Sequence, residues 1–273
     1  MTVVEAPAKL TLSLRVTGVR DDGYHLIDAE MVSLSLCDSI EITPAPDATT
    51  FAATGPYAGG MPLDATNLMA TALHVTGRHA EILIDKQIPH GGGLGGGSSD
   101  AAAILRWAGL RPSPTSLSTA AAIGADVAFC LVGGRARVRG IGDDVEPMPF
   151  VDRAVTLVVP PLHVSTPAVY RAWDTLGGPT ADGPNDLEPA ALVVEPALAR
   201  WRDLIGEACG QTPVLAGSGA TWFVPGMHDN ALAAVGNEGA DIITVRTTRS
   251  PFDVQVRDEE TGGTSGRDSG RTG

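Results

Sequence analysis

The chain has 273 residues, 43% of them hydrophobic, and a formal net charge of −13 at pH 7. This length provides for one large domain or two modest ones with cores of their own. No apolar run is long enough to span a membrane, and the acidic excess argues against a nucleic-acid surface, which needs a basic stripe.

The first half of the chain mixes strand and helix patterns. Residues 3–16 predict two short strand pieces around Pro7, and residues 30–43 alternate apolar and polar side chains as a half-buried strand does. Residues 44–62, rich in Pro, Ala and Gly, predict a loop. The patterns that follow are a helix over 67–77, a strand over 80–85, a glycine-rich loop, helices over 99–107 and 116–123, and a solvent-facing strand over 135–139.

The composition changes around residues 143–150, which we take as a domain boundary. The second half reads as a strand over 154–159, a helix over 166–175, an amphipathic helix over 196–209, a glycine-containing turn over 216–221, a strand over 222–224, a helix over 229–236 and a strand over 241–247. From about residue 255 the chain is polar and predicts a disordered tail. Without a regular βαβ repeat, an α+β fold in two domains is favoured.

The most informative segment is the glycine-rich loop from Pro89 to Ser99. Six of the seven residues from Gly91 to Gly97 are glycine, so the backbone is free to adopt positive φ and to present several N–H groups to one concavity. A helix pattern follows directly, and the N-terminus of a helix favours anions. The loop therefore predicts a binding site for a nucleotide polyphosphate.

Three other interpretations of this loop fit less well. A flexible linker would have unstructured flanks, whereas a strand precedes the loop and a helix follows it. Gly91, Gly93 and Gly96 match the dinucleotide pattern G-x-G-x-x-G, but no acidic residue lies between Asp100 and Asp126 to hold the ribose. A Walker A loop would require G-K-[ST], which is absent.

The choice of basic residues points to two positions. Of 19 basic residues only Lys9 and Lys86 are lysine, which suggests that a compact ammonium is needed at each. Lys9 lies in the segment Ala-Pro-Ala-Lys, and Lys86 lies just before the glycine-rich loop. A catalytic or ligand-binding role is predicted for both, against the alternative of an ordinary surface lysine.

The cysteines and the N-terminus indicate a reducing compartment. Cys37, Cys130 and Cys209 are isolated in apolar contexts, which favours buried thiols over a disulfide framework or a zinc site. The six histidines lack metal-ligand spacing, and the first residues lack the features of a signal peptide. We therefore expect a cytoplasmic protein without a dedicated metal site.

Several separated segments together resemble the GHMP small-molecule kinases. They are Ala-Pro-Ala-Lys-Leu at 6–10 with Asp-Gly-Tyr-His at 22–25, the glycine-rich loop, Gly-Ala-Asp-Val at 124–127, Val-Ser-Thr-Pro at 164–167 with Tyr170, Asn-Asp-Leu-Glu at 185–188 and the turn at 216–221. In detail they are similar to the 4-diphosphocytidyl-2-C-methyl-D-erythritol kinase family, and the resemblance covers roughly residues 5–225.

This resemblance implies a fold and an activity. The fold would be a two-domain GHMP kinase fold, with an ATP-binding domain of the ribosomal protein S5 domain 2 type over 1–150 and a ferredoxin-like α/β sandwich over 151–254. The activity would be ATP-dependent phosphorylation of the 2-hydroxyl of 4-diphosphocytidyl-2-C-methyl-D-erythritol, in the non-mevalonate isoprenoid pathway. The partners would be small molecules, ATP and a cytidine diphosphate-linked sugar alcohol, with no nucleic acid and no membrane.

Residue roles follow from the resemblance and from the chemistry of phosphoryl transfer. Asp126 is the predicted base, with a helix or turn cap as the alternative, and Lys9 is predicted to pair with it and keep it ionised. Mg²⁺ is expected as a cofactor held mainly by ATP phosphates and water.

The predicted ATP-binding residues are Pro89, His90, Gly91, Gly92, Gly93, Leu94, Gly95, Gly96, Gly97, Ser98, Ser99, Asn67 and Lys86. The predicted substrate-binding residues are Thr11, Tyr24, His25, Tyr170, Gly217, Ser218 and Gly219, with Tyr24 and Tyr170 suited either to sandwich the cytosine or to pack in the core.

Three positions depart from the family pattern. Thr11 stands where Asn is usual, Ala128 stands where Pro is usual, and the stretch 109–118 is shorter. None of these changes removes a reacting group. Two alternatives remain: another GHMP kinase acting on homoserine, mevalonate or a sugar, or a nucleotide-binding homologue with impaired catalysis.

Overall fold

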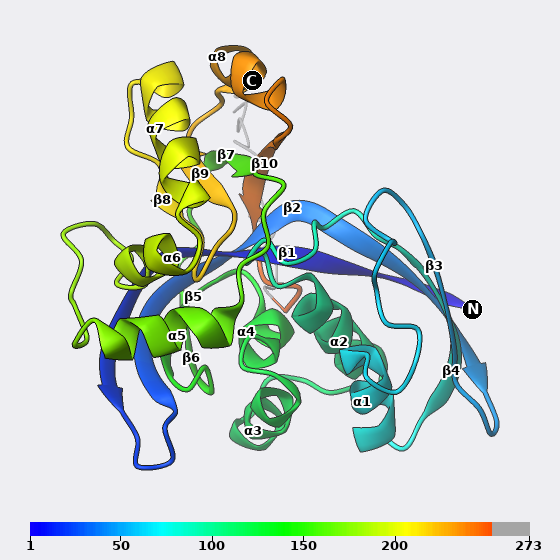
Figure 1. Cartoon of the computed structure of the whole chain (residues 1–273). Helices are drawn as coiled ribbons and strands as arrows, with labels where there is room; N and C mark the ends of the chain where they lie inside the picture. Colours follow the sequence, from blue (N-terminus) through cyan, green and yellow to red (C-terminus); the bar gives the residue numbers. More distant parts are fainter. Residues whose placement is uncertain (253–273) are drawn as a thin grey trace, which may run out of the picture.

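The chain folds into two groups of strands and helices. A computed structural model describes residues 1–252, so the predicted tail at 255–273 lies outside the described part (Figure 1). The first group is β1 (Thr2–Val19), β2 (His25–Ala45), β3 (Thr50–Thr54), α1 (Leu68–Val75), β4 (His79–Asp85), α2 (Gly96–Trp107), α3 (Pro114–Ile123), α4 (Val127–Val132), β5 (Arg135–Gly140) and β6 (Asp144–Met148). The second group is β7 (Ala154–Val159), α5 (Thr166–Thr175), α6 (Glu188–Val194), α7 (Ala197–Cys209), β8 (Val214–Leu215), β9 (Trp222–Pro225), α8 (Asp229–Gly236) and β10 (Asp241–Thr248).

One sheet runs through both groups, in the order β3-β4-β2-β10-β7-β9-β8. β1 and β5 also pair with β2, and β6 pairs with β5. β3 is parallel to β4 and the other pairings are antiparallel. β10 pairs with β7 along most of its length, while Thr247 and Thr248 pair with Leu34 and Ser33 of β2. The division of the chain at residue 150 stays a prediction, and the sheet is continuous across it.

Two apolar clusters hold the elements around the site. In the first, α1 to α4 lie together beside the β1–β2 hairpin, with Ile40, Ile104 and Phe129 fully buried (Figure 1). The second cluster includes Leu10 of β1, Leu34 of β2 and Leu157 of β7, and it also contains Leu94 of the glycine-rich loop. Burial of a leucine side chain contributes about 1.5–3 kcal/mol. Leu94 therefore anchors an otherwise glycine-rich segment to the core.

The mixed α/β character of the fold is confirmed, and so are most of the predicted elements. The strand over 154–159 and the helices over 166–175 and 229–236 have the predicted bounds. The strand predicted over 80–85 is β4, whose side chains alternate between exposed and buried as the sequence pattern requires. The helix predicted over 67–77 is α1, and Asn67 caps its N-terminus.

Other predicted elements were wrong, for identifiable reasons. The segment around Pro7 is one continuous strand, because a register shift between Pro7 and Lys9 accommodates the missing N–H. Residues 44–62 contain β3, which pairs in parallel with β4 despite its Pro- and Gly-rich flanks. α2 begins at Gly96 rather than residue 99, because tertiary packing overrides the low helix propensity of glycine. The short elements β6, α4 and α6 were missed because five to seven residues carry little periodic signal.

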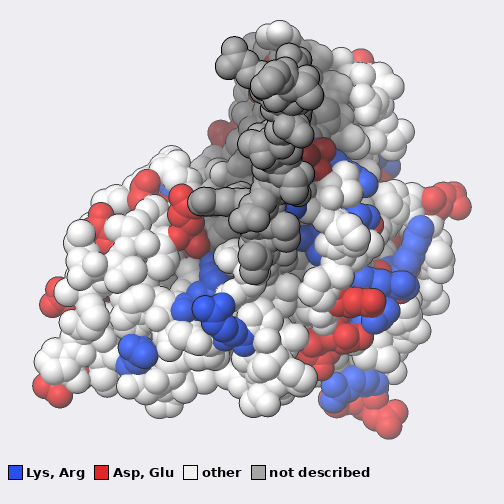
Figure 2. All heavy atoms as spheres, turned by 180° about the vertical axis from the view of Figure 1, so that it is seen from behind, with Lys and Arg blue, Asp and Glu red and all other residues white. Residues whose placement is uncertain are grey.

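The rear surface carries charges of both signs. Figure 2 shows blue and red side chains interleaved there. On β5 and its neighbours Arg137 pairs with Asp28, and Arg139 pairs with Asp144 and Glu146. Within residues 1–252 these cations are neutralised locally, and they do not form a basic stripe of the kind that nucleic acids require.

The three cysteines are free thiols, of which Cys130 is buried and Cys37 and Cys209 are half-buried. Burial raises the pKa of Cys37 to about 11 and that of Cys130 to about 12. Over the described range, 1–252, no helix has both the length and the apolar character needed to cross a bilayer.

Candidate active site

Lys9 and Asp126 form an ion pair at the centre of the molecule. Lys9 lies on β1 and Asp126 directly precedes α4, and the Lys9 Nζ is 3.2 Å from Asp126 Oδ2. The Lys9 side chain is 7% exposed and that of Asp126 is 33% exposed, so the carboxylate is reachable while the ammonium is enclosed. The Lys9 Nζ also donates to Thr11 Oγ1 at 3.3 Å.

The alternative role of Asp126 as a helix cap is not observed. Asp126 occupies the N-cap position of α4, but its side chain makes no capping hydrogen bond and its backbone is helical (φ −83°, ψ −9°). A capping carboxylate would accept from an N–H of the first turn. The Asp126 carboxylate instead faces Lys9 and a pocket.

The pocket that Asp126 faces is lined by residues from both groups of elements. It has a volume of about 170 Å³ and is lined by Lys9, Thr11 and Asp126 from the first group and by Tyr170, Gly217 and Ser218 from the second. Gly93 of the glycine-rich loop also lines it. The structure therefore brings together five segments that the sequence analysis had singled out separately.

The glycine-rich loop has the geometry of an anion cradle. Gly91, Gly93 and Gly95 have φ values of +70°, +75° and +67°, a region that favours glycine. Gly95 is the N-cap of α2 and no side chain caps that helix, so the N–H groups of its first turn remain available. The Leu94 carbonyl accepts from Lys9 N at 2.9 Å, which fixes the loop against β1.

Close packing also requires glycine in this loop. A Cβ at Gly93 would lie 2.5 Å from the Ala216 carbonyl oxygen, and one at Gly95 would lie 2.6 Å from Lys9 Cγ. The loop thus rests directly on the predicted catalytic lysine and on the turn at 216–221. The hydrogen bond from Thr221 N to Gly92 O, 3.3 Å long, connects the same two segments.

Of the aromatic residues predicted to bind the acceptor substrate, His25 and Tyr170 line the pocket and Tyr24 does not. His25 and Tyr170 lie ring against ring with centroids 4.6 Å apart, and His25 Nε2 is 2.7 Å from Asp174 Oδ1. Burial, with a smaller contribution from Asp126, raises the pKa of Tyr170 to about 12. Tyr24 is 61% exposed beside Arg20 and does not line the pocket, so the pairing of Tyr24 with Tyr170 is not observed.

Three predicted ATP-binding side chains are engaged elsewhere. Lys86 is 1% exposed and contacts Asp38 and Asp100, so a direct contact with phosphate does not fit its position. The Ser99 hydroxyl donates to the Pro7 carbonyl at 2.6 Å beneath the loop, which leaves Ser98 as the accessible serine. The Asn67 side chain caps α1 and donates to the Pro62 carbonyl, and its place beside adenine stays a prediction.

Two residues of the site were not singled out from the sequence. Thr166 lines the pocket at the start of α5, and its hydroxyl is 2.7 Å from the Ser218 hydroxyl. Asp174 orients His25 from the same helix, one turn after Tyr170. Thr166 belongs to a segment already noted, so its signal was present, whereas the contact of Asp174 with His25 depends on the tertiary fold.

Two of the three departures from the family pattern, Thr11 and Ala128, leave the site intact. Thr11 is buried and accepts from Lys9, so its hydroxyl stays within the constellation. Ala128 is fully buried in the first turn of α4. Both alanine and proline are compatible with the first turn of a helix, so this change does not disturb α4.

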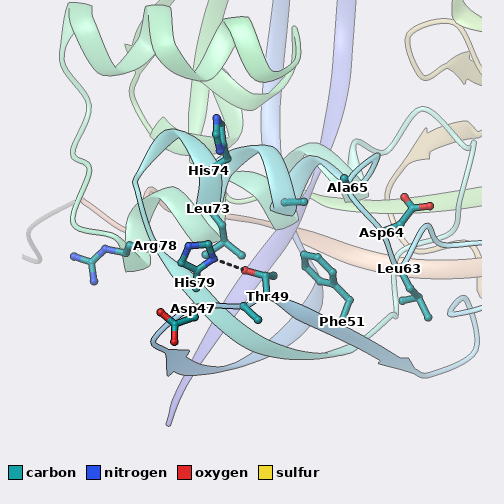
Figure 3. A pocket seen from close by; sticks show the side chains of 12 residues that line it. Asp47, Thr49, Phe51, Leu63, Asp64, Ala65, Leu73, His74, Arg78 and His79 are labelled. Carbon is teal, nitrogen blue, oxygen red and sulfur yellow. Dashed lines mark hydrogen bonds between the residues drawn. The ribbon is translucent and has the colours of Figure 1, made fainter.

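A second pocket is separate from this site. Figure 3 shows it between β3, α1 and the start of β4, with Phe51, Leu73, His74 and His79 among its walls. Its volume is about 300 Å³, larger than that of the pocket at Lys9. None of the predicted catalytic or loop residues lines it, so size alone does not identify the active site.

The buried cluster around Lys86 leads to a prediction about stability and pH. Burial raises the pKa of Asp100 from 3.8 to about 8, against the opposing effect of Lys86. Between these values the unfolded chain releases this proton and the folded chain retains it, so stability falls as pH rises, by at most about 1.4 kcal/mol per pH unit. Asp100→Asn should flatten this slope and increase the free energy of unfolding near pH 8. Urea titrations at pH 5, 6.5 and 8 measure the effect, and parallel slopes in both proteins would contradict it.

Comparison with known proteins places this geometry among kinases. The family model described as "GHMP kinases N terminal domain" matches residues 61–134. A 4-diphosphocytidyl-2-C-methyl-D-erythritol kinase from Paracoccus denitrificans is 39% identical over 237 residues, covering 80% of this chain and 84% of the relative. One from Paramagnetospirillum magneticum is 37% identical over 250 residues, covering 81% and 87%.

Solved structures agree. The crystal structure of a 4-(cytidine 5'-diphospho)-2C-methyl-D-erythritol kinase has a TM-score of 0.72 at 28% identity, covering 90% of this chain and 99% of its own. The mevalonate kinase of L. major, at 13% identity and a TM-score of 0.64, covers 91% of this chain and 96% of its own, and it shares the fold.

Proposed function

The chain belongs to the 4-diphosphocytidyl-2-C-methyl-D-erythritol kinase family of GHMP kinases and is an ATP-dependent small-molecule kinase, and we propose that Lys9 and Asp126 carry its phosphoryl transfer. The acceptor is the 2-hydroxyl of 4-diphosphocytidyl-2-C-methyl-D-erythritol, in the non-mevalonate route to isoprenoid precursors. The observation that supports this most is that the Lys9–Asp126 ion pair lines one pocket together with Gly93 of the glycine-rich loop and Tyr170.

The ion pair acts on the acceptor hydroxyl. Asp126 accepts the proton of the acceptor hydroxyl as the hydroxyl oxygen attacks the γ-phosphorus, while the bond from the γ-phosphorus to the β,γ-bridging oxygen breaks and ADP leaves. The Asp126 side chain is 33% exposed, which leaves room for the acceptor. The Lys9 ammonium, 3.2 Å away, offsets the negative charge that gathers at the reacting oxygens. The Thr11 hydroxyl accepts a hydrogen bond from the same ammonium and helps to hold it in place.

The glycine-rich loop binds the donor. Its positive-φ glycines and the uncapped first turn of α2 offer N–H donors, which suit phosphate oxygens rather than a metal ion. Mg²⁺ would accordingly be held mainly by the phosphates of ATP and by water. When bound, it supplies charge neutralisation along the triphosphate.

Two aromatic rings that line the pocket suit a nucleoside. His25 and Tyr170 already lie against each other, and a pyrimidine has a flat face that stacks on such rings. Tyr24, exposed at the β1–β2 turn, remains available to a bound base from the solvent side. The three free thiols support a cytoplasmic location, where ATP is also present.

A coupled assay of ADP release tests the choice of acceptor. We expect turnover with 4-diphosphocytidyl-2-C-methyl-D-erythritol and none above background with homoserine or mevalonate, since neither offers a base for the His25–Tyr170 face. Turnover with either small acceptor at a comparable rate would identify another GHMP kinase. No turnover with any acceptor, together with normal ATP binding, would favour the catalytically impaired homologue.

A further inference from the structure

Lys86, Asp38 and Asp100 form a buried ionic cluster beneath the glycine-rich loop. The Lys86 ammonium contacts Asp38 Oδ2 and lies 2.7 Å from Asp100 Oδ2. All three side chains are at most 3% exposed. A lysine buried this deeply is costly unless its charge is paired and hydrogen-bonded. The cluster therefore needs an explanation beyond surface solvation.

The cluster ties together the two ends of the loop. On the strand side, Asp38 Oδ1 accepts from Gln87 N at 2.6 Å and from Ile88 N at 2.9 Å, just before the loop begins. On the helix side, Asp100 lies in α2, which begins where the loop ends. The Lys86 ammonium thus links the residues just before the loop, through Asp38, with the helix α2 that follows it, through Asp100.

The ammonium also lies close under the start of α2. A Cβ at Gly96, the first residue of that helix, would be 3.4 Å from Lys86 Nζ and 3.2 Å from a methyl group of Ile88. A larger residue at this position would press on both. The lysine is therefore packed directly against the backbone that forms the helix side of the phosphate cradle.

The charges of the cluster balance when Asp100 carries a proton. Burial favours the protonated carboxyl, since one ammonium already has Asp38 as its charged partner. Asp100 Oδ1 has no hydrogen-bond partner among residues 1–252, as fits a carboxyl that is not fully ionised. Asp100 also interacts with the buried Cys130 thiol of α4, whose pKa it helps to raise. A neutral cluster adds no negative charge beneath a site meant for a triphosphate.

We propose that Lys86 is a positioning residue of the donor site, which together with Asp38 and Asp100 holds both ends of the glycine-rich loop in the geometry that binds MgATP. Lys86 does this without touching the nucleotide. The inference rests on the proposed kinase function, because it assigns the loop to ATP. It replaces the direct contact with ATP that the sequence suggested for this lysine.

Two substitutions at Asp100 separate positioning from bulk stability. Asp100→Leu keeps the neutral Lys86–Asp38 pair but removes the acceptor that ties the ammonium to α2, whereas Asp100→Asn keeps an acceptor oxygen. Loss of one charge-assisted hydrogen bond corresponds to about a tenfold change in an equilibrium constant. We therefore expect Asp100→Leu to bind MgATP about tenfold more weakly by calorimetry without acceptor, and Asp100→Asn to restore binding to within about threefold.

The kinetic pattern should match the binding data. In Asp100→Leu the KM for ATP should rise about tenfold, while kcat at saturating ATP and the KM for the acceptor change by less than about threefold. A purely structural role would lower the fraction of active protein and reduce kcat instead. Asp85→Asn, one residue before Lys86 and outside the cluster, is the matched control and should leave all three constants unchanged.

Each outcome bears on the proposal. MgATP binding by Asp100→Leu as tight as that of the unmodified chain overturns it. Should that variant fail to fold, Lys86→Met/Asp38→Asn removes the ammonium and its charged partner together, and the same tenfold loss is expected, with wild-type affinity overturning the proposal. An unmodified chain that binds MgATP but does not phosphorylate the acceptor refutes the proposed function alone. An unmodified chain that does not bind MgATP refutes both.

Discussion

Asp126→Asn lowers kcat by about a thousandfold, the effect expected from losing a positioned general base, while the affinity for MgATP stays within about threefold. The amide is nearly the same size as the carboxylate but does not accept the proton of the hydroxyl at neutral pH. The glycine-rich loop does not contact Asp126 through any hydrogen bond in residues 1–252, so the donor site is preserved. Initial rates with each substrate varied, together with calorimetric binding of MgATP, measure both parts.

Asp152→Asn is the matched control for this substitution. Asp152 pairs with Arg246 on the surface and is 55% exposed, so the same chemical change there should leave kcat unaltered. If Asp126→Asn stayed within a few-fold of the unmodified chain, the assignment of Asp126 as the base would be wrong.

Lys9→Met should lower kcat by about two to three orders of magnitude, because it removes the ammonium that offsets charge in the transition state. Methionine keeps the aliphatic stem that packs against Gly95, where the space next to Lys9 Cγ is already filled. The loop should therefore keep its position, and the KM for ATP should rise far less than kcat falls. Steady-state kinetics with both substrates, with circular dichroism as a check of folding, provide the measurement.

A double variant shows whether the two residues act as a unit. Because Lys9 and Asp126 are 3.2 Å apart, Lys9→Met/Asp126→Asn should be little slower than Asp126→Asn alone. Fully additive losses would mean that the pair seen in the structure does not act together in the reaction.

Sequence reasoning located the site better than it located the edges of the fold. The glycine-rich loop, Lys9 and Asp126 were identified from residue types and from a family resemblance, and the structure brings all of them to one pocket. The sequence did not predict that β10 of the second group pairs with β2 of the first, because the pairing of Thr247 and Thr248 with β2 is a contact between distant parts of the chain. Alternation along one segment carries no information about which strand lies beside it.

Lys86 shows where composition is informative and where it is not. The rarity of lysine drew attention to Lys86, whose ammonium is buried in the structure. The sequence did not reveal its partners, because Asp38 and Asp100 come from β2 and α2. For a similar reason the sequence named both Ser98 and Ser99, whereas the structure shows that the Ser99 hydroxyl donates to the Pro7 carbonyl. Tyr24 and His25 differ in the same way at the β1–β2 turn, where neighbouring side chains point to opposite faces.

The most direct test of the account is a ³¹P NMR spectrum of the unmodified chain with MgATP and 4-diphosphocytidyl-2-C-methyl-D-erythritol. We predict that the γ-phosphate signal of ATP disappears while one new phosphomonoester signal and those of ADP grow in equal amounts, and that the diphosphate of the acceptor persists. Release of the γ-phosphate only as inorganic phosphate, or a spectrum no different from that without enzyme, would contradict the conclusion that the Lys9–Asp126 pocket phosphorylates this acceptor.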